Sequence, residues 1–140
     1  MANDSVQTIS YEEFNNGIAD MKGTEDIAIN SSVYIISDDT VTIVPGSTSS
    51  AVTAKTLGWT VRPFDYSDDN RVGVQSKYNR RTHRTVATGA TVAAGDFVML
   101  DLTLPGTIRP WEQGVDYESQ KLGIALVGAV PAGTAHIAEE

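Results

Sequence analysis

Two histidines, His83 and His136, decide whether nucleophilic catalysis with an imidazole base is available to this chain. A hydroxyl nucleophile needs a base within hydrogen-bond reach and a further group that orients this base. His83 lies in the basic run NRRTHR and His136 lies between Ala135 and Ile137, so neither has the neighbours that this chemistry requires. The chain also has no cysteine and no G-x-S-x-G, H-E-x-x-H, phosphate-loop or G-x-G-x-x-G pattern. We therefore expect no enzymatic activity and no cofactor.

Three aspartates in the stretch DYSDDN, Asp65, Asp68 and Asp69, offer the hard oxygen ligands that Ca²⁺ prefers. The stretch lacks the ligand spacing and the glycine of an EF-hand loop. A solvated turn is therefore the favoured interpretation of residues 65–70, and a calcium site is the alternative.

Residues 71–84 form a basic segment in an acidic chain, with five basic and no acidic side chains against a net charge of −8 overall. Cations beside Tyr78 fit a groove for single-stranded nucleic acid, a charged edge strand, or a docking surface for an acidic protein partner. Because the acidic remainder of the chain repels a polyanion, no nucleic-acid partner is expected, and the other two interpretations are favoured. The partner-binding residues predicted here are Arg71, Lys77, Arg80, Arg81 and Arg84.

The elements that position these residues are predicted to be mainly β-strands. Val, Ile and Thr number 14, 10 and 15 of the 140 residues, against 6 Leu. Branched side chains lose χ1 freedom in helices and pack well on a pleated surface. No window is apolar for long enough to cross a bilayer, and the first ten residues lack the basic start and apolar stretch of a secretion signal. We expect no membrane partner.

Residues 1–30 are predicted to form an N-terminal arm and a short helix. Residues 1–9 are polar, and a helix over residues 10–23 is indicated by a capping box at its start, by one apolar face and by a glycine at its end. The residues that give these signals are Ser10, Glu13, Phe14, Ile18, Met21 and Gly23.

Residues 31–140 are predicted to form one β domain. Two branched runs, 33–36 and 41–44, flank a polar turn, which is typical of a hairpin. Val98 and three leucines alternate with Met99, Asp101 and Thr103 over 98–104, which predicts a strand with one apolar face, closed by Pro105-Gly106. The run LGIALVGAV (122–130) predicts a buried central strand, which pairs with a final strand after residue 131. A small antiparallel β-barrel or β-sandwich follows from these elements.

One phrase occurs twice, as VAAGDFVML at 92–100 and as VPAGTAHIA at 130–138. Each copy reads as a turn on Ala-Gly followed by a strand, where glycine tolerates the positive φ that such turns require. Nine aligned residues are too few to claim a duplication, so two ordinary hairpin turns are the favoured interpretation.

The C-terminal stretches TVATGATVAAGDFVMLD (85–101) and KLGIALVGAVPAGTAHIAEE (121–140) resemble the head decoration, or cement, proteins of tailed bacteriophages. The resemblance implies a β-rich, β-tulip-like body, a homotrimer on the virion exterior, synthesis in the host cytoplasm, and the major capsid protein as partner. It also implies an N-terminal arm that grips neighbouring subunits and an absence of enzymatic activity. The matching residues are Val92, Ala94, Gly95, Asp96, Val98, Leu100, Gly123, Ile124, Ala125, Ala132, Gly133 and Thr134.

A cement role needs an arm that adds a strand to a partner's sheet while its side chains fill pockets, and Ile9, Tyr11 and Phe14 are predicted to do this. We expect a protein without residues 1–22 to fold but not to bind capsids. Two alternatives stay open: another virion component, such as a tail or head-completion protein, and a soluble carbohydrate- or ligand-binding domain with a pocket lined by Trp59 or Trp111.

Overall fold

The computed structural model describes residues 11–13, 17–45 and 54–139. The fold of these residues is mainly β, as the composition predicted. The elements are β2 (Tyr11–Glu13), β3 (Ile18–Gly23), β4 (Ser32–Ser37), β5 (Thr40–Ile43), β6 (Thr56–Thr60), β7 (Val72–Ser76), β8 (Arg80–Val86), β9 (Phe97–Leu100), β10 (Thr107–Pro110), a 3₁₀ turn η2 (Glu118–Gln120), β11 (Gly123–Val127) and β12 (Thr134–Glu139).

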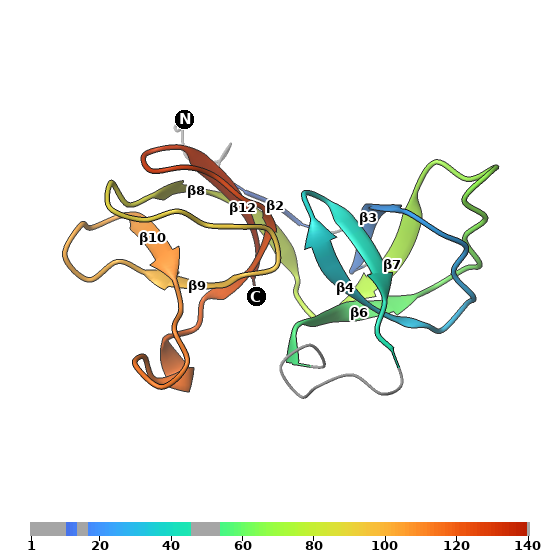
Figure 1. Ribbon diagram of the computed structural model, residues 1–140, viewed down its shortest axis with the longest axis horizontal. Coiled ribbons are helices and arrows are strands. Elements are labelled where there is room, and N and C mark those ends of the chain that lie inside the picture. Colours follow the sequence, from blue (N-terminus) through green and yellow to red (C-terminus); the bar gives the residue numbers. More distant parts are fainter. Residues whose placement is uncertain (1–10, 14–16, 46–53, 140) are drawn as a thin grey trace.

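These strands form two rings that lie side by side (Figure 1). The first, called barrel 1, closes in the order β3-β5-β4-β6-β7. The second, called barrel 2, runs β10-β9-β11-β12-β8 and closes because β10 also pairs with β8. Strand β2 pairs with residues 80–82 of β8, on the same edge whose residues 85–86 pair with β10. The predicted barrel is thus confirmed, although the chain builds two rings and each contains one parallel pair.

Both barrels have the same topology and the same register. In each, the first strand pairs in parallel with the third and antiparallel with the fifth, and the fourth strand lies between the second and the fifth. When Val33 is aligned with Val98, the paired residues of the two barrels correspond. The pair Ile35–Val41 in barrel 1 then matches the pair Leu100–Ile108 in barrel 2. The isolated bridge Ile27↔Phe64 likewise matches Val92↔Ala129. The two halves of the chain are therefore structural repeats of one barrel.

The phrase that occurs twice in the sequence is not this repeat. In its first copy the positive φ falls on Gly95, at 91°, whereas in the second it falls on Ala132, at 66°. The two phrases therefore form different turns, both inside barrel 2, and glycine supplies the positive φ in the first turn alone. The structural repeat instead relates residues 18–76 to residues 81–139.

The helix predicted over residues 10–23 is wrong where the structure describes it, because residues 11–13 and 18–23 are strands. In β3, Ala19 and Met21 are buried while Asp20 and Lys22 are exposed, which is the period of a strand. Closing barrel 1 pairs residues 18–21 of β3 with β7 and residues 22–23 with β5, and this outweighs the local helix signals. Gly17, with a φ of 79°, also lies outside the helical region. Barrel 1 thus begins before residue 31, inside the segment predicted to be arm and helix.

The strand predicted over 98–104 ends at Leu100. Asp101 then forms a turn, because its carboxylate accepts hydrogen bonds from the backbone N–H groups of Thr103 and Leu104. These hydrogen bonds also lower the pKa of Asp101, with the Thr103 hydroxyl contributing most. Leu102 and Leu104 are left exposed on the hairpin. The other hairpin, β4–β5, and the pairing of the buried β11 with β12 are confirmed.

The two barrels share apolar packing. Barrel 2 has its own core, and residues on the outer side of β11 and β12 are buried in the core of barrel 1. These outer residues are Ile124, Leu126 and Ala138. Burying an aliphatic side chain of this size stabilises a fold by about 2 kcal/mol, so the contact holds the barrels together as one body.

Candidate functional site

The two histidines lie against each other although 53 positions separate them in the chain. His83 on β8 and His136 on β12 are cross-strand partners, and their rings stack with centroids 4.2 Å apart and planes 18° apart. Arg81 donates a hydrogen bond to Nδ1 of His136 over 3.0 Å. The same guanidinium donates two hydrogen bonds of 2.9 Å to the carboxylate of Asp39, in the β4–β5 turn of barrel 1. The histidine pair is thus part of the contact between the barrels.

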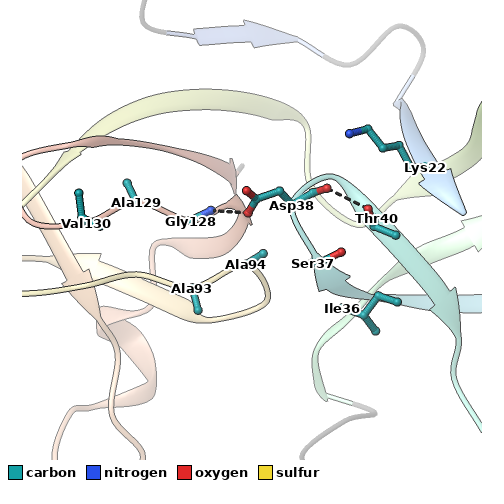
Figure 2. Close-up of a pocket in the computed structure, with 10 residues that line it drawn as sticks. All are labelled: Lys22, Ile36, Ser37, Asp38, Thr40, Ala93, Ala94, Gly128, Ala129 and Val130. Carbon is teal, nitrogen blue, oxygen red and sulfur yellow. Dashed lines mark hydrogen bonds between the residues drawn. The ribbon is translucent and has the colours of Figure 1, made fainter. Parts of the chain in front are cut away.

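The turn that carries Asp39 is bound to barrel 2 by its backbone as well. The N–H of Asp39 donates to the carbonyl of Leu126 over 2.8 Å. The carboxylate of Asp38 accepts from the N–H of Gly128 over 3.1 Å (Figure 2). From the sequence, Asp38-Asp39 is only a turn, and no local signal shows that it docks onto a second barrel.

The basic segment contains two ion pairs within the molecule. Arg81 and Asp39 have side chains 14% and 20% exposed. Arg84 forms a two-pronged pair with Glu139, with both distances 2.8 Å, and the Thr82 hydroxyl donates to the same carboxylate. The Glu139 side chain is 8% exposed. These two arginines therefore neutralise carboxylates of the fold, one half-buried and one buried.

The edge-strand interpretation of the basic segment is wrong. Strand β8 lies between β12 on one side and β2 and β10 on the other. Arg71 is exposed and donates a hydrogen bond to the carbonyl of Asp20. Lys77 is exposed overall. Partial burial of its ammonium nevertheless lowers the pKa of Lys77, and the positive charge of Lys121 lowers it further. Arg80 is half-buried.

The structure describes only some of the predicted arm residues. Ile9 and Phe14 lie outside the described residues, and for Tyr11 the structure describes the backbone, in β2. Its register partner is Thr82 of β8. Residues 11–13 thus add a strand to the sheet of their own chain.

The acidic loop is a hydrogen-bonded turn. Asp65 accepts hydrogen bonds from the backbone and hydroxyl of Ser67, which lower its pKa, and its N–H donates to the carboxylate of Asp69. Within residues 17–45 and 54–139, no group of three or more carboxylate or histidine side chains could hold a metal ion. The calcium alternative gains no support from this part of the chain.

A groove of about 710 Å³ lies between the barrels (Figure 2). Barrel 1 contributes Lys22, Ile36, Ser37, Asp38 and Thr40, and the facing wall consists of Ala93, Ala94, Gly128, Ala129 and Val130 of barrel 2. Asp38 and Thr40 make hydrogen bonds within the groove, which leaves small and branched apolar side chains as most of its surface. Such a wall suits packing against another chain better than proton transfer.

Trp111 lines a separate pocket of about 580 Å³, as the ligand-binding alternative predicted for one of the two tryptophans. The indole stands edge-on to Phe97, and the ammonium of Lys121 lies 4.1 Å from its ring centroid and 3.9 Å from that of Phe97. The lysine covers one face of the indole and gains cation–π energy there. A sugar would have to displace it to stack on that face, so the pocket does not favour the carbohydrate alternative.

The loop behind Trp111 is fixed by an ion pair. Arg109 donates to both carboxylate oxygens of Asp116, over 3.0 and 2.7 Å. This pair raises the pKa of Arg109 and lowers that of Asp116, which also accepts from the N–H of Glu112. The indole N–H donates to the carbonyl of Tyr117.

No protein-family model matches the chain, and no curated protein matches it. None of the helices among the described residues has the length and apolarity to cross a membrane.

Proposed function

We propose that this protein is a structural component of a virion without enzymatic activity, which binds the outer surface of an assembled phage capsid and stabilises it. The observation that carries the proposal is the joining of two closed barrels by a shared core and an ion pair. A body that is already ordered loses little conformational entropy when it binds. Its loops expose apolar side chains, among them Leu102, Val115, Tyr117 and Val130.

The proposed mechanism is linkage between binding and assembly. A protein that binds the assembled shell and not its free subunits adds its binding free energy to the stability of the shell. Many copies on one shell add their contributions, so a modest affinity per copy is sufficient. The major capsid protein is the proposed partner, and the resemblance of residues 85–101 and 121–140 to cement proteins supports this choice.

The basic segment offers two exposed cations for such a contact, Arg71 and Lys77, since Arg81 and Arg84 neutralise carboxylates of the fold. Charged groups at the rim of an interface mainly set orientation and association rate. We expect the double substitution Arg71→Glu and Lys77→Glu to slow binding to capsids about tenfold at low salt. Arg62→Glu, an exposed position outside the segment, is the control and should bind nearly as the parent protein does.

The deciding experiment mixes the purified protein with empty capsids of the phage that encodes it and sediments the shells. Saturable co-sedimentation and a higher melting temperature of the shell are expected. Equal affinity for unassembled capsid subunits, or no binding at saturating concentrations, would contradict the proposal.

A further inference from the structure

The contact between the two barrels has two halves. One is the end of barrel 1 formed by Ile35 and the β4–β5 turn with Asp39. The other is the face of barrel 2 formed by β8, β11 and β12, where Ile124 and Leu126 are fully buried. Because the barrels are repeats, each half of this contact has an equivalent elsewhere in the molecule.

The equivalent end of barrel 2 is uncovered. Leu100 holds the position of Ile35, yet it is 45% exposed where Ile35 is 4% exposed. Gly106, with a φ of 83°, stands directly before β10 as Asp39, with a φ of 51°, stands before β5. Between them the hairpin exposes Leu102 and Leu104, at 73% and 39%. Figure 1 shows this β9–β10 hairpin at the end of barrel 2 that is remote from barrel 1.

The equivalent face of barrel 1 is also uncovered. Trp59 holds the position of Ile124, because each pairs with the first residue of the second strand in its barrel. Trp59 is 47% exposed, whereas Ile124 is fully buried. Val61, at the position of Leu126, and Ile18, at the position of Arg81, are half-buried apolar neighbours. The face is formed by β3, β6 and β7.

We propose that copies of this protein associate head to tail, with the β9–β10 hairpin of one copy packed on the β3–β6–β7 face of the next. The association repeats between copies the contact that joins the barrels within one copy. It matches exposed leucines with an exposed tryptophan, and tryptophan is among the side chains enriched at the buried centre of interfaces. The two surfaces differ from each other, so the contact is heterologous and continues into a ring or a filament.

The chemistry of this contact differs from that within the chain. Asp39 and Arg81 form an ion pair within the chain, and their equivalents are Gly106 and Ile18, which carry no charge. The contact between copies therefore lacks this ion pair, and salt should weaken it less than the contact within the chain. It does not depend on a capsid role, because the experiment that tests it contains only this protein.

Cross-linking tests the proposal directly, because the chain has no cysteine of its own. Leu102→Cys and Trp59→Cys are made in separate proteins, mixed, and treated with a short bismaleimide. A covalent dimer is expected from the mixture and not from either protein alone. Val115→Cys, 69% exposed on another loop, replaces Leu102→Cys in the control mixture, which should give at least tenfold less dimer.

Light scattering gives the second readout. The parent protein at high concentration should exceed the mass of one chain, in 50 mM and in 500 mM salt alike. The double substitution Leu102→Asp and Leu104→Asp should reduce it to one chain, while Val115→Asp leaves it unchanged. Circular dichroism verifies that the variants are folded. A parent protein of monomer mass, a dimer from Leu102→Cys alone, or an assembly that survives the double substitution would each overturn the head-to-tail contact.

Discussion

Gly58 and Gly123 occupy the same position in the two barrels and are glycines for the same reason. A Cβ on Gly58 would lie 1.8 Å from the carbonyl oxygen of Gln75, and one on Gly123 would lie 2.1 Å from that of Ala138. Both carbonyls belong to the fifth strand of their barrel, at matching register. The fourth and fifth strands therefore approach so closely that a side chain at this point would separate them.

We predict that Gly58→Ala and Gly123→Ala each lower the free energy of unfolding by about 3 kcal/mol, because the clash is with backbone that cannot move aside. Urea denaturation measures the loss. Gly89→Ala is the control, since a Cβ there meets no atom within 4 Å. A change below 1 kcal/mol at both strand positions would contradict the close approach.

The ion pair between the barrels should be needed for stability. Removing one partner of a fully buried pair costs about 3–5 kcal/mol, and partial exposure of Asp39 and Arg81 reduces this to about 2 kcal/mol for Asp39→Asn. Asparagine tolerates the positive φ of residue 39, so the change tests the charge alone. Glu118→Gln, which removes a 77% exposed carboxylate from its pair with Lys121, should change stability by less than about 0.5 kcal/mol. Equal effects of the two substitutions in chemical denaturation would refute the distinction.

The Arg109–Asp116 pair predicts a pH dependence. Arg109 lowers the pKa of Asp116 below its ordinary value of 3.8, so the folded state binds this proton less readily than the unfolded state. The resulting stability is present above pH 4 and is lost as the pH falls through the folded-state pKa. Asp116→Asn should melt lower at neutral pH and lose less on acidification than the parent protein. Identical acid dependence in Asp116→Asn and the parent would argue against this role.

Truncation separates the arm from the barrel. The structure argues against the expectation that a protein lacking residues 1–22 still folds, because this deletion removes most of β3, which pairs with β5 and β7 to close barrel 1. Removing residues 1–22 should therefore abolish cooperative unfolding of barrel 1, while removing residues 1–10 leaves both barrels intact. Hydrogen exchange at β5 and β7 measures the difference. Only the shorter deletion is a fair test of the arm in capsid binding.

The local sequence pattern was sufficient to predict the strands whose pairing partners are near in the chain. The β4–β5 hairpin has branched runs on both sides of a polar turn, and β11 is an apolar run followed by a turn into β12. It failed for β3, whose capping box and apolar spacing favour a helix until β5 and β7 are present. It also failed at Asp101, where side-chain hydrogen bonds to the backbone end a strand that hydrophobic alternation would continue.

The candidate interaction surfaces could also be predicted from the sequence only in part. The basic segment is visible in the sequence, but the partners of Arg81 and Arg84 lie 42 and 55 positions away, so charge alone could not separate exposed cations from neutralised ones. The exposure of Leu102 and Trp59 could not be predicted from the sequence either, because both residue types are also common in a buried core. Exposure depends on which surface another element covers.

Composition and alternation by themselves determined that this chain is built of strands, since branched side chains favour a pleated backbone whatever their neighbours are. Only the tertiary structure decided that the strands close twice into the same barrel. A closed ring constrains which positions face inward and how closely strands approach, and it leaves the identity of most side chains free. Val33 and Val98 are alike, whereas Ile18 and Arg81, equally equivalent, are not. The structural repeat is therefore evident in the register of the paired strands and hardly at all in the amino-acid sequence.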